Sequence, residues 1–147
     1  MLEMLSDRPR IQDLERFLKL MMDHRNDLEF VVLFGSMAHG NWTRSSDYDV
    51  LVGLQSEDGQ RIIDRMTAFD QYVQGNIEVF PYARSEWQRM ISQYHPLYLD
   101  ALDYGIVLLD RGRFADLRQQ FLEWKRDGVV EPLKHGGWRI NIRGDDD

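Results

Sequence analysis

The stretch LEFVVLFGSMAHGNWTRSSDYDVLVGL, residues 28–54, decides the fold. Its first part, Leu28–Phe34, is apolar, aromatic and β-branched and stops at Gly35, which predicts a strand buried on both faces of a sheet. A compact segment over 36–41 and a polar turn then lead to a second predicted strand over 47–54. We therefore expect two strands of one sheet, joined through a short helical segment and a loop.

The rest of the chain predicts helices alternating with strands. Apolar residues at a spacing of three and four indicate helices, and β-branched runs indicate strands. Asp7 is expected to cap the first helix, and Gly75 to close the second one. The expected helices are 9–25, 62–69, 85–94, 96–104 and 114–126; the further strands are 76–82 and 106–109; the tail offers a short hairpin of 129–131 and 137–140.

One α/β domain over residues 1–147 accounts for these elements, with a motif core at about 28–82 and a helical C-terminal extension at about 84–147. A chain of this length can build a core without disulfides or structural zinc. The final three residues, Asp145–Asp147, are expected to form a solvated end.

Composition excludes several classes of protein. The chain has no cysteine, which excludes disulfides and thiol catalysis. Its apolar runs are far shorter than the roughly 20 residues of a membrane span, and its acidic start lacks the features of a secretory signal, so a cytoplasmic location is expected. The net charge of −7 argues against strong nucleic-acid binding.

Three carboxylates form the most informative constellation. Side chains alternate along a strand, so Asp47 and Asp49 project from one face while Tyr48 points to the other. Without a cation between them, such carboxylates repel each other, and the pKa of at least one rises. Glu78 would join them if its strand lies beside theirs. Mg²⁺ prefers such oxygen ligands, and two metal ions roughly 3.5–4 Å apart suit phosphoryl or nucleotidyl transfer.

Gly35 and Ser36 lie where the buried strand gives way to a short helix. Backbone N–H groups, the helix N-terminus and the Ser36 hydroxyl could all point at phosphate oxygens there. A side chain at position 35 would block the approach of the backbone. Ser36 could alternatively serve only as a helix cap.

The order of strand, Gly-Ser, ten residues, Asp-x-Asp, helix, and strand with a third acid resembles the DNA polymerase β type nucleotidyltransferase superfamily. It is most similar to the minimal nucleotidyltransferases, the MNT proteins. The resemblance implies a small mixed β-sheet flanked by helices, two Mg²⁺ ions and ATP as nucleotide donor. It also implies a protein partner, since many MNT proteins are antitoxins of HEPN-domain ribonucleases and some transfer AMP to a tyrosine of that toxin.

The resemblance assigns a role to each motif residue. Gly35 and Ser36 match the nucleotide-phosphate motif, Asp47 and Asp49 the metal-binding acids, and Glu78 the third acid, which acts as general base or metal ligand. The matching region covers about residues 30–82.

The chain departs from the family pattern at three positions. Met37 and His39 stand where the family often has basic residues, and Glu78 stands where Asp is common. Phosphate binding would then depend on Arg44 or be weaker than is usual in the family.

Three functions remain open at this stage. The first is an adenylyltransferase that modifies a hydroxyl of a HEPN-type toxin. The second is a binding module with weak or lost catalysis that neutralises its partner sterically, which Met37 and His39 favour slightly. The third is transfer of a nucleotide to a small molecule such as an antibiotic, for which the segment after Tyr82 is short. Nucleic-acid polymerisation ranks last, because no basic groove is visible.

Overall fold

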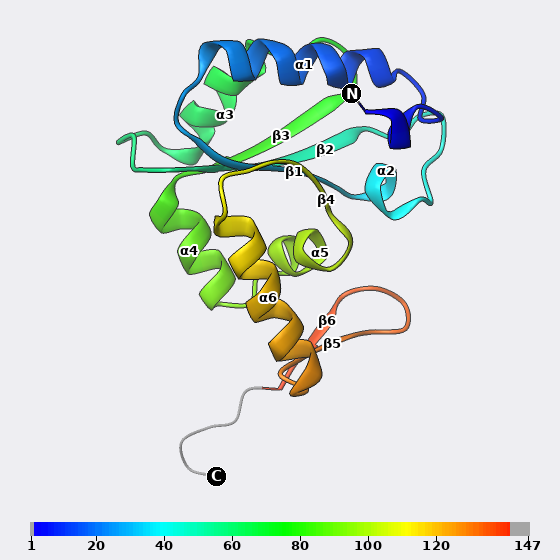
Figure 1. Cartoon of the computed structure of the whole chain (residues 1–147), viewed down its shortest axis with the longest axis vertical. Coiled ribbons are helices and arrows are strands. Elements are labelled where there is room, and N and C mark those ends of the chain that lie inside the picture. The colour runs from blue at the N-terminus through cyan, green and yellow to red at the C-terminus, as the bar shows by residue number, and fades with distance from the viewer. Residues whose placement is uncertain (1, 142–147) are drawn as a thin grey trace.

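The computed structural model describes residues 2–141, so the expectation for Asp145–Asp147 lies outside the described residues. The chain forms a sheet between two layers of helices (Figure 1). Its elements are η1 (Glu3–Leu5), α1 (Ile11–His24), β1 (Leu28–Phe34), α2 (Ser36–His39), β2 (Tyr48–Leu54), α3 (Ile62–Asp70), β3 (Ile77–Tyr82), α4 (Arg84–Ser92), α5 (Pro96–Tyr104), β4 (Ile106–Asp110), α6 (Arg113–Arg126), β5 (Val130–Pro132) and β6 (Trp138–Ile140).

The main sheet has the order β3-β2-β1-β4. Strand β1 is antiparallel to both of its neighbours, whereas β2 and β3 run parallel. Helices α1 and α3 lie on one side of this sheet and α4, α5 and α6 on the other (Figure 1). The predicted α/β fold with a small mixed sheet flanked by helices is therefore confirmed.

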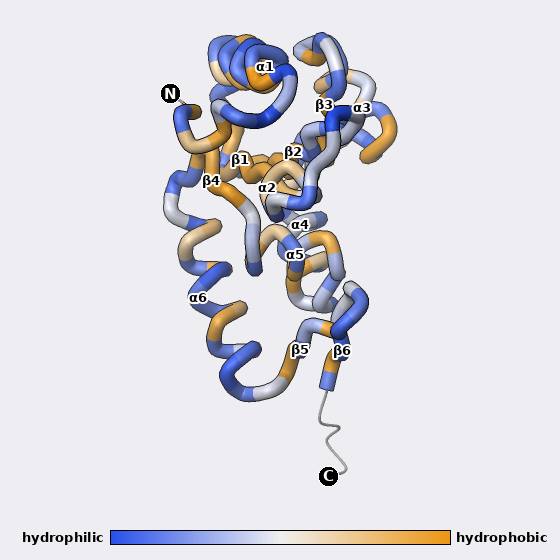
Figure 2. The backbone as a smooth tube through the Cα atoms, turned by 90° about the vertical axis from the view of Figure 1, so that its right-hand side faces the viewer, coloured by the Kyte–Doolittle hydropathy of each residue, from blue (hydrophilic) through white to orange (hydrophobic). Residues whose placement is uncertain are grey.

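Strand β1 is buried along its whole length, as its sequence predicted. Val31 and Leu33 pack into the core under α1 and α3, whereas Phe30 and Val32 pack into the core under α4, α5 and α6. In Figure 2, β1 and β4 are hydrophobic, while α1 and α6 alternate between hydrophilic and hydrophobic residues. The central strand thus supplies both cores, and the amphipathic helices complete them.

The C-terminal half completes the same sheet. Strand β4 pairs with β1, and α6 packs against both. Sequence analysis found β4 but could not predict its neighbour, because β1 and β4 are more than 70 residues apart. No helix within residues 2–141 is long and apolar enough to cross a membrane.

Two predicted helix boundaries were wrong. The first helix begins at Ile11 after Arg10, and Asp7 does not cap it: its carboxylate accepts a hydrogen bond from the Arg8 guanidinium at 2.6 Å. The second predicted helix, α3, ends at Asp70, well before Gly75, which has a φ of +96° and lies two residues before the start of β3. The intervening residues form turns, so the glycine serves the entry into a strand.

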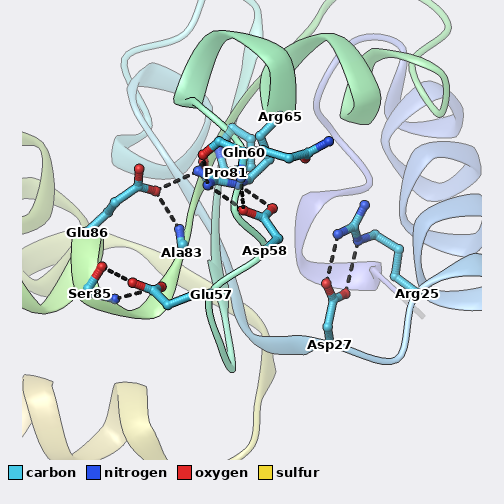
Figure 3. A network of polar contacts seen from close by, with 10 residues as sticks. All are labelled: Arg25, Asp27, Glu57, Asp58, Gln60, Arg65, Pro81, Ala83, Ser85 and Glu86. Carbon is cyan, nitrogen blue, oxygen red and sulfur yellow. Dashed lines mark hydrogen bonds and ion pairs between the residues drawn. The ribbon is translucent and has the colours of Figure 1, made fainter.

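Arg65 is a buried cation at the carboxyl ends of β2 and β3 (Figure 3). Its guanidinium donates to both carboxylate oxygens of Asp58 at 2.8 Å and to Glu86 at 2.5 Å. It also donates to the carbonyl oxygens of Gln60 and Pro81. These contacts join α3 to the loop after β2 and to the start of α4, and the Arg65 hydrogen bonds lower the pKa of Asp58 to about 2.

Candidate active site

The parallel pairing of β2 with β3 brings two of the predicted acids together. Asp49 and Glu78 are direct partners in the register, and the charge of Glu78 acts on Asp49. Asp49 is half-buried and Glu78 is exposed. Tyr48 points to the opposite face, where it is buried and its hydroxyl donates to the Pro9 carbonyl at 2.8 Å. The predicted opposite orientation of Tyr48 and Asp49 is therefore confirmed, whereas β2 begins at Tyr48 and Asp47 lies just outside the strand.

Asp49 is the acid whose protonation the site changes most. Its pKa rises from an ordinary 3.8 to about 6, first because burial removes water from the carboxylate. The charges of Glu78 and Asp47 and the hydrogen bond to Glu78 raise it further. The structure thus agrees with the predicted mutual repulsion of these acids and locates its main effect on Asp49.

The three acids are not equally assembled. Asp47 is exposed and precedes β2, and it acts on Asp49 through its charge. Within residues 2–141, no three His, Cys, Asp or Glu side chains lie close enough together to hold a metal ion as placed. The oxygen donors themselves suit Mg²⁺, and their repulsion favours a cation between them. Asp49 and Glu78 are therefore two candidate metal ligands that already lie side by side. Asp47 is a third candidate ligand, which lies exposed just before β2.

Gly35 lies directly against Asp49. Its φ of +74° belongs to the left-handed region that favours glycine, and a Cβ at this position would collide with the Asp49 carboxylate. The structure thus requires glycine here because of the Asp49 side chain, whereas the expected approach of the backbone to a phosphate stays a prediction. Gly35 is also the N-cap of α2, so the alternative of Ser36 as the cap is wrong; Ser36 is the half-buried first residue of that helix.

Helix α2 has only four residues. Such a helix has little macrodipole, because that dipole sums over aligned peptide units. Any phosphate contact here would depend on individual N–H groups and on the Ser36 hydroxyl.

The surroundings differ among the three residues around the expected phosphate-binding site, Met37, His39 and Arg44. Met37 is fully buried in the core, so a basic residue at this position would place its charge among apolar side chains. His39 is exposed, and its ring lies 4.7 Å from the ring of Tyr104. Arg44 is exposed on the loop between α2 and β2. Of these three, only His39 and Arg44 can offer polar side chains to a ligand.

Tyr104 is a neighbour of the site that sequence analysis did not select. It ends α5, and its ring lies beside that of His39 in α2. Burial raises the pKa of Tyr104 most, followed by the charge of Asp100, and Asp49 also contributes, so the net shift is upward. No local motif marks Tyr104, because only the packing of α5 beside α2 brings it there.

A comparison with known protein families matches the part of the chain that contains these residues. The family described as "Polymerase beta, Nucleotidyltransferase" matches residues 17–94, which include β1, the Gly-Ser turn, β2 and β3. No curated protein shows a significant match to the chain.

Three solved structures illustrate the shared fold. A candidate nucleotidyltransferase from Sulfolobus solfataricus is 21% identical with a TM-score of 0.52, over 69% of this chain and 83% of that one. A chain of a toxin–antitoxin crystallised with AMP-PNP is 15% identical with a TM-score of 0.51, over 77% and 86%. A chain of a mutant MntA–HpeT toxin–antitoxin is 17% identical with a TM-score of 0.52, over 78% and 86%.

At these identities the structural likeness establishes the fold alone. The family match goes further, because it spans more than half of the 147 residues and contains all three acids. The protein belongs to the polymerase β nucleotidyltransferase family.

Proposed function

We propose that this protein is a Mg²⁺-dependent nucleotidyltransferase that transfers AMP from ATP to a hydroxyl group of a partner protein. The observation that carries the proposal is the register pair Asp49–Glu78, which brings two carboxylates together while Gly35 lies against Asp49. Membership of the family supports the class of reaction. The raised pKa of Asp49 supports a site that gains from a cation.

Each residue of the site has a proposed task. Asp47 and Asp49 would hold the metal ions, and Glu78 would complete the ligand set or accept the proton of the incoming hydroxyl. The Gly35 backbone and the Ser36 hydroxyl would contact the triphosphate, because both lie at the start of α2 and Gly35 lies against Asp49. The exposed Arg44 would supply positive charge to the phosphates. These tasks follow from the chemistry of each side chain.

The reaction exchanges one phosphorus–oxygen bond for another. The acceptor hydroxyl oxygen bonds to the α-phosphorus of ATP, the bond from that phosphorus to the bridging oxygen breaks, and pyrophosphate leaves. The hydroxyl proton passes to a carboxylate, for which Glu78 is positioned beside Asp49. When bound, Mg²⁺ ions would lower the pKa of the incoming hydroxyl and offset the charge of the pyrophosphate.

We propose a tyrosine of a HEPN-type toxin as the acceptor, which would make the protein an antitoxin. The fold that it shares with chains of toxin–antitoxin structures, one of them crystallised with AMP-PNP, supports this choice. A phenolic hydroxyl suits the mechanism, since its pKa near 10 is closer to neutral than that of a serine hydroxyl.

The test uses ATP labelled at the α-phosphate, Mg²⁺ and the protein encoded by the gene next to that of this chain. Wild type should label that protein on a tyrosine, and Asp47→Asn combined with Asp49→Asn should abolish labelling. Glu15→Gln, an exposed carboxylate on α1, is the matched control and should label like wild type. Absence of labelling by wild type, with both proteins folded and in contact, would refute the catalytic proposal.

A second function is favoured by one observation. Among the described residues the three acids do not form a ready-made ligand group, and the buried Met37 adds no charge to the phosphate loop. A protein that neutralises its partner by steric contact would have this arrangement. In that case, wild type and the double variant should inhibit the partner equally, whereas the catalytic proposal requires the double variant to lose inhibition.

A further inference from the structure

The segment Arg8–Arg10, here called the N-terminal clasp, lies across the loop that carries the motif. Arg10 donates from Nη1 to the Arg44 carbonyl at 2.6 Å and from Nη2 to the Ser46 carbonyl at 2.8 Å. These carbonyls lie three residues and one residue before Asp47. One guanidinium therefore holds the backbone that leads directly into the first metal-binding acid.

The rest of the clasp holds the two ends of the same segment. Arg8 donates from Nε to the Met37 carbonyl at 3.0 Å, in α2. The Tyr48 hydroxyl donates to the Pro9 carbonyl at 2.8 Å, at the start of β2. The clasp thus contacts α2, the loop just before Asp47 and the first residue of β2.

The loop has little regular structure of its own. Between α2 and β2 it contains one tight turn, in which Ser46 N donates to the Thr43 carbonyl at 3.1 Å and Thr43 N donates to Ser46 Oγ at 2.8 Å. Asp47 follows this turn, exposed to solvent. The residue after it is fixed, because Tyr48 N donates to the Asn76 carbonyl at 2.8 Å, so the position of Asp47 relative to Asp49 further depends on what holds the preceding carbonyls.

Arg10 adopts an unfavourable conformation to make these contacts. Its backbone has a φ of 56° and a ψ of 34°, a left-handed conformation that non-glycine residues seldom adopt. Its Nε is buried without a hydrogen-bond partner within the described residues. Local strain of this kind occurs at functional sites, where the surrounding contacts maintain it.

We propose that Arg10 is a positioning residue of the nucleotidyltransferase site: by holding the Arg44 and Ser46 carbonyls, it sets the placement of Asp47 beside Asp49. This inference rests on the function proposed above for Asp47. The forked guanidinium is essential, because a lysine ammonium has no two donors fixed at the spacing of the two carbonyls.

The experiment compares Arg10→Ala and Arg10→Lys with wild type, and Arg16→Ala serves as the control because Arg16 is an exposed arginine of α1. The first measurement is amide hydrogen exchange without metal. In Arg10→Ala, exchange over residues 43–47 should rise at least about tenfold, while β1 and β2 keep their protection and the control matches wild type. Unchanged exchange over 43–47 would overturn the proposal.

The second measurement is the Mg²⁺ dependence of ATP binding and AMP transfer. Loss of a residue that orients a metal ligand lowers metal affinity by about 10- to 100-fold. We expect the half-saturating Mg²⁺ concentration to rise by about tenfold in Arg10→Ala, and the KM for ATP at saturating Mg²⁺ to change by less than about threefold. Equal rises in both would indicate general damage and overturn the positioning role.

Arg10→Lys keeps the inference testable if Arg10→Ala does not fold. It should fall between wild type and Arg10→Ala in both measurements, and a lysine variant identical to wild type would contradict the need for a fork. If wild type neither binds ATP with Mg²⁺ nor transfers AMP, the proposed function fails. The hydrogen-exchange result would still decide whether Arg10 orders the loop.

Discussion

Replacing Asp49 with asparagine should stabilise the metal-free protein at neutral pH, although the same change should abolish the proposed activity. Asp49 is half-buried, and its pKa rises to about 6 because burial and the charges of Glu78 and Asp47 disfavour the carboxylate. Asparagine is close in shape, carries no charge and can donate a hydrogen bond to Glu78. The substitution therefore removes the repulsion without creating a large cavity.

The magnitude follows from the pKa. Each unit of difference between folded and unfolded protein is worth about 1.4 kcal/mol, so the gap between 3.8 and about 6 sets a ceiling of roughly 3 kcal/mol. Solvent screening at this half-exposed group reduces the expectation to about 1–2 kcal/mol. Because the folded pKa is the higher one, the folded state binds the proton more tightly, and wild-type stability falls as pH rises from about 4 to about 6.

The assay is urea unfolding of wild type and Asp49→Asn, with chelator present, at pH 4 and at pH 7.5. The two proteins should differ little at pH 4, and the variant should be more stable by about 1–2 kcal/mol at pH 7.5. Glu15→Gln changes the net charge equally and should show no such gain. A variant that is no more stable than wild type at pH 7.5 would refute the electrostatic account of the site, as would an equal gain at both pH values.

Two further predictions concern the fold. Arg65→Met should destabilise the protein by about 2–4 kcal/mol in urea unfolding at pH 7, because Asp58 and Glu86 lose their shared cation. Since the pKa of Asp58 is lowered to about 2, this deficit should shrink between about pH 4 and pH 2, and a deficit independent of pH would contradict the ion-pair explanation. Gly53→Ala should cost about 1–3 kcal/mol in thermal or urea unfolding, because its methyl group would collide with the Phe30 ring; an unchanged stability would contradict that contact.

The features predicted from sequence depend on short-range periodicity. The strand period placed Asp47 and Asp49 on one face and Tyr48 on the other, and the apolar run of β1 indicated burial on both sides. Glu78 could be proposed as a partner only on the condition that β3 lies beside β2, since strand order is not encoded locally. The register pair with Asp49 meets that condition.

Features that depend on distant contacts were not predictable. Arg10 contacts carbonyls more than 30 residues away, and Tyr104 reaches Gly35 only through the packing of α5. Arg65 lies on α3, whose apolar spacing gave no sign of a buried cation. Its burial is explained only by its ion-pair partners, Asp58 and Glu86. The predicted Asp7 cap failed for a related reason. Residues 8–10, which precede α1, make the contacts of the N-terminal clasp, and the helix starts later than its composition indicated.

The carboxylates at one end of the parallel pair β2–β3 are paired with a cation, and those at the other end are not paired within the described residues. At the carboxyl ends, Asp58 and Glu86 share the buried Arg65. At the amino ends, none of the ion pairs formed within residues 2–141 includes Asp47, Asp49 or Glu78. Arg65 thus compensates the negative charge at the carboxyl ends, whereas no such ion pair does so at the amino ends within the described residues. A metal cation bound at the amino ends would gain the electrostatic attraction that an arginine would otherwise have. The electrostatic repulsion around Asp49 is therefore the physical basis of the proposed Mg²⁺ dependence, because its relief when the metal binds adds to the free energy of binding.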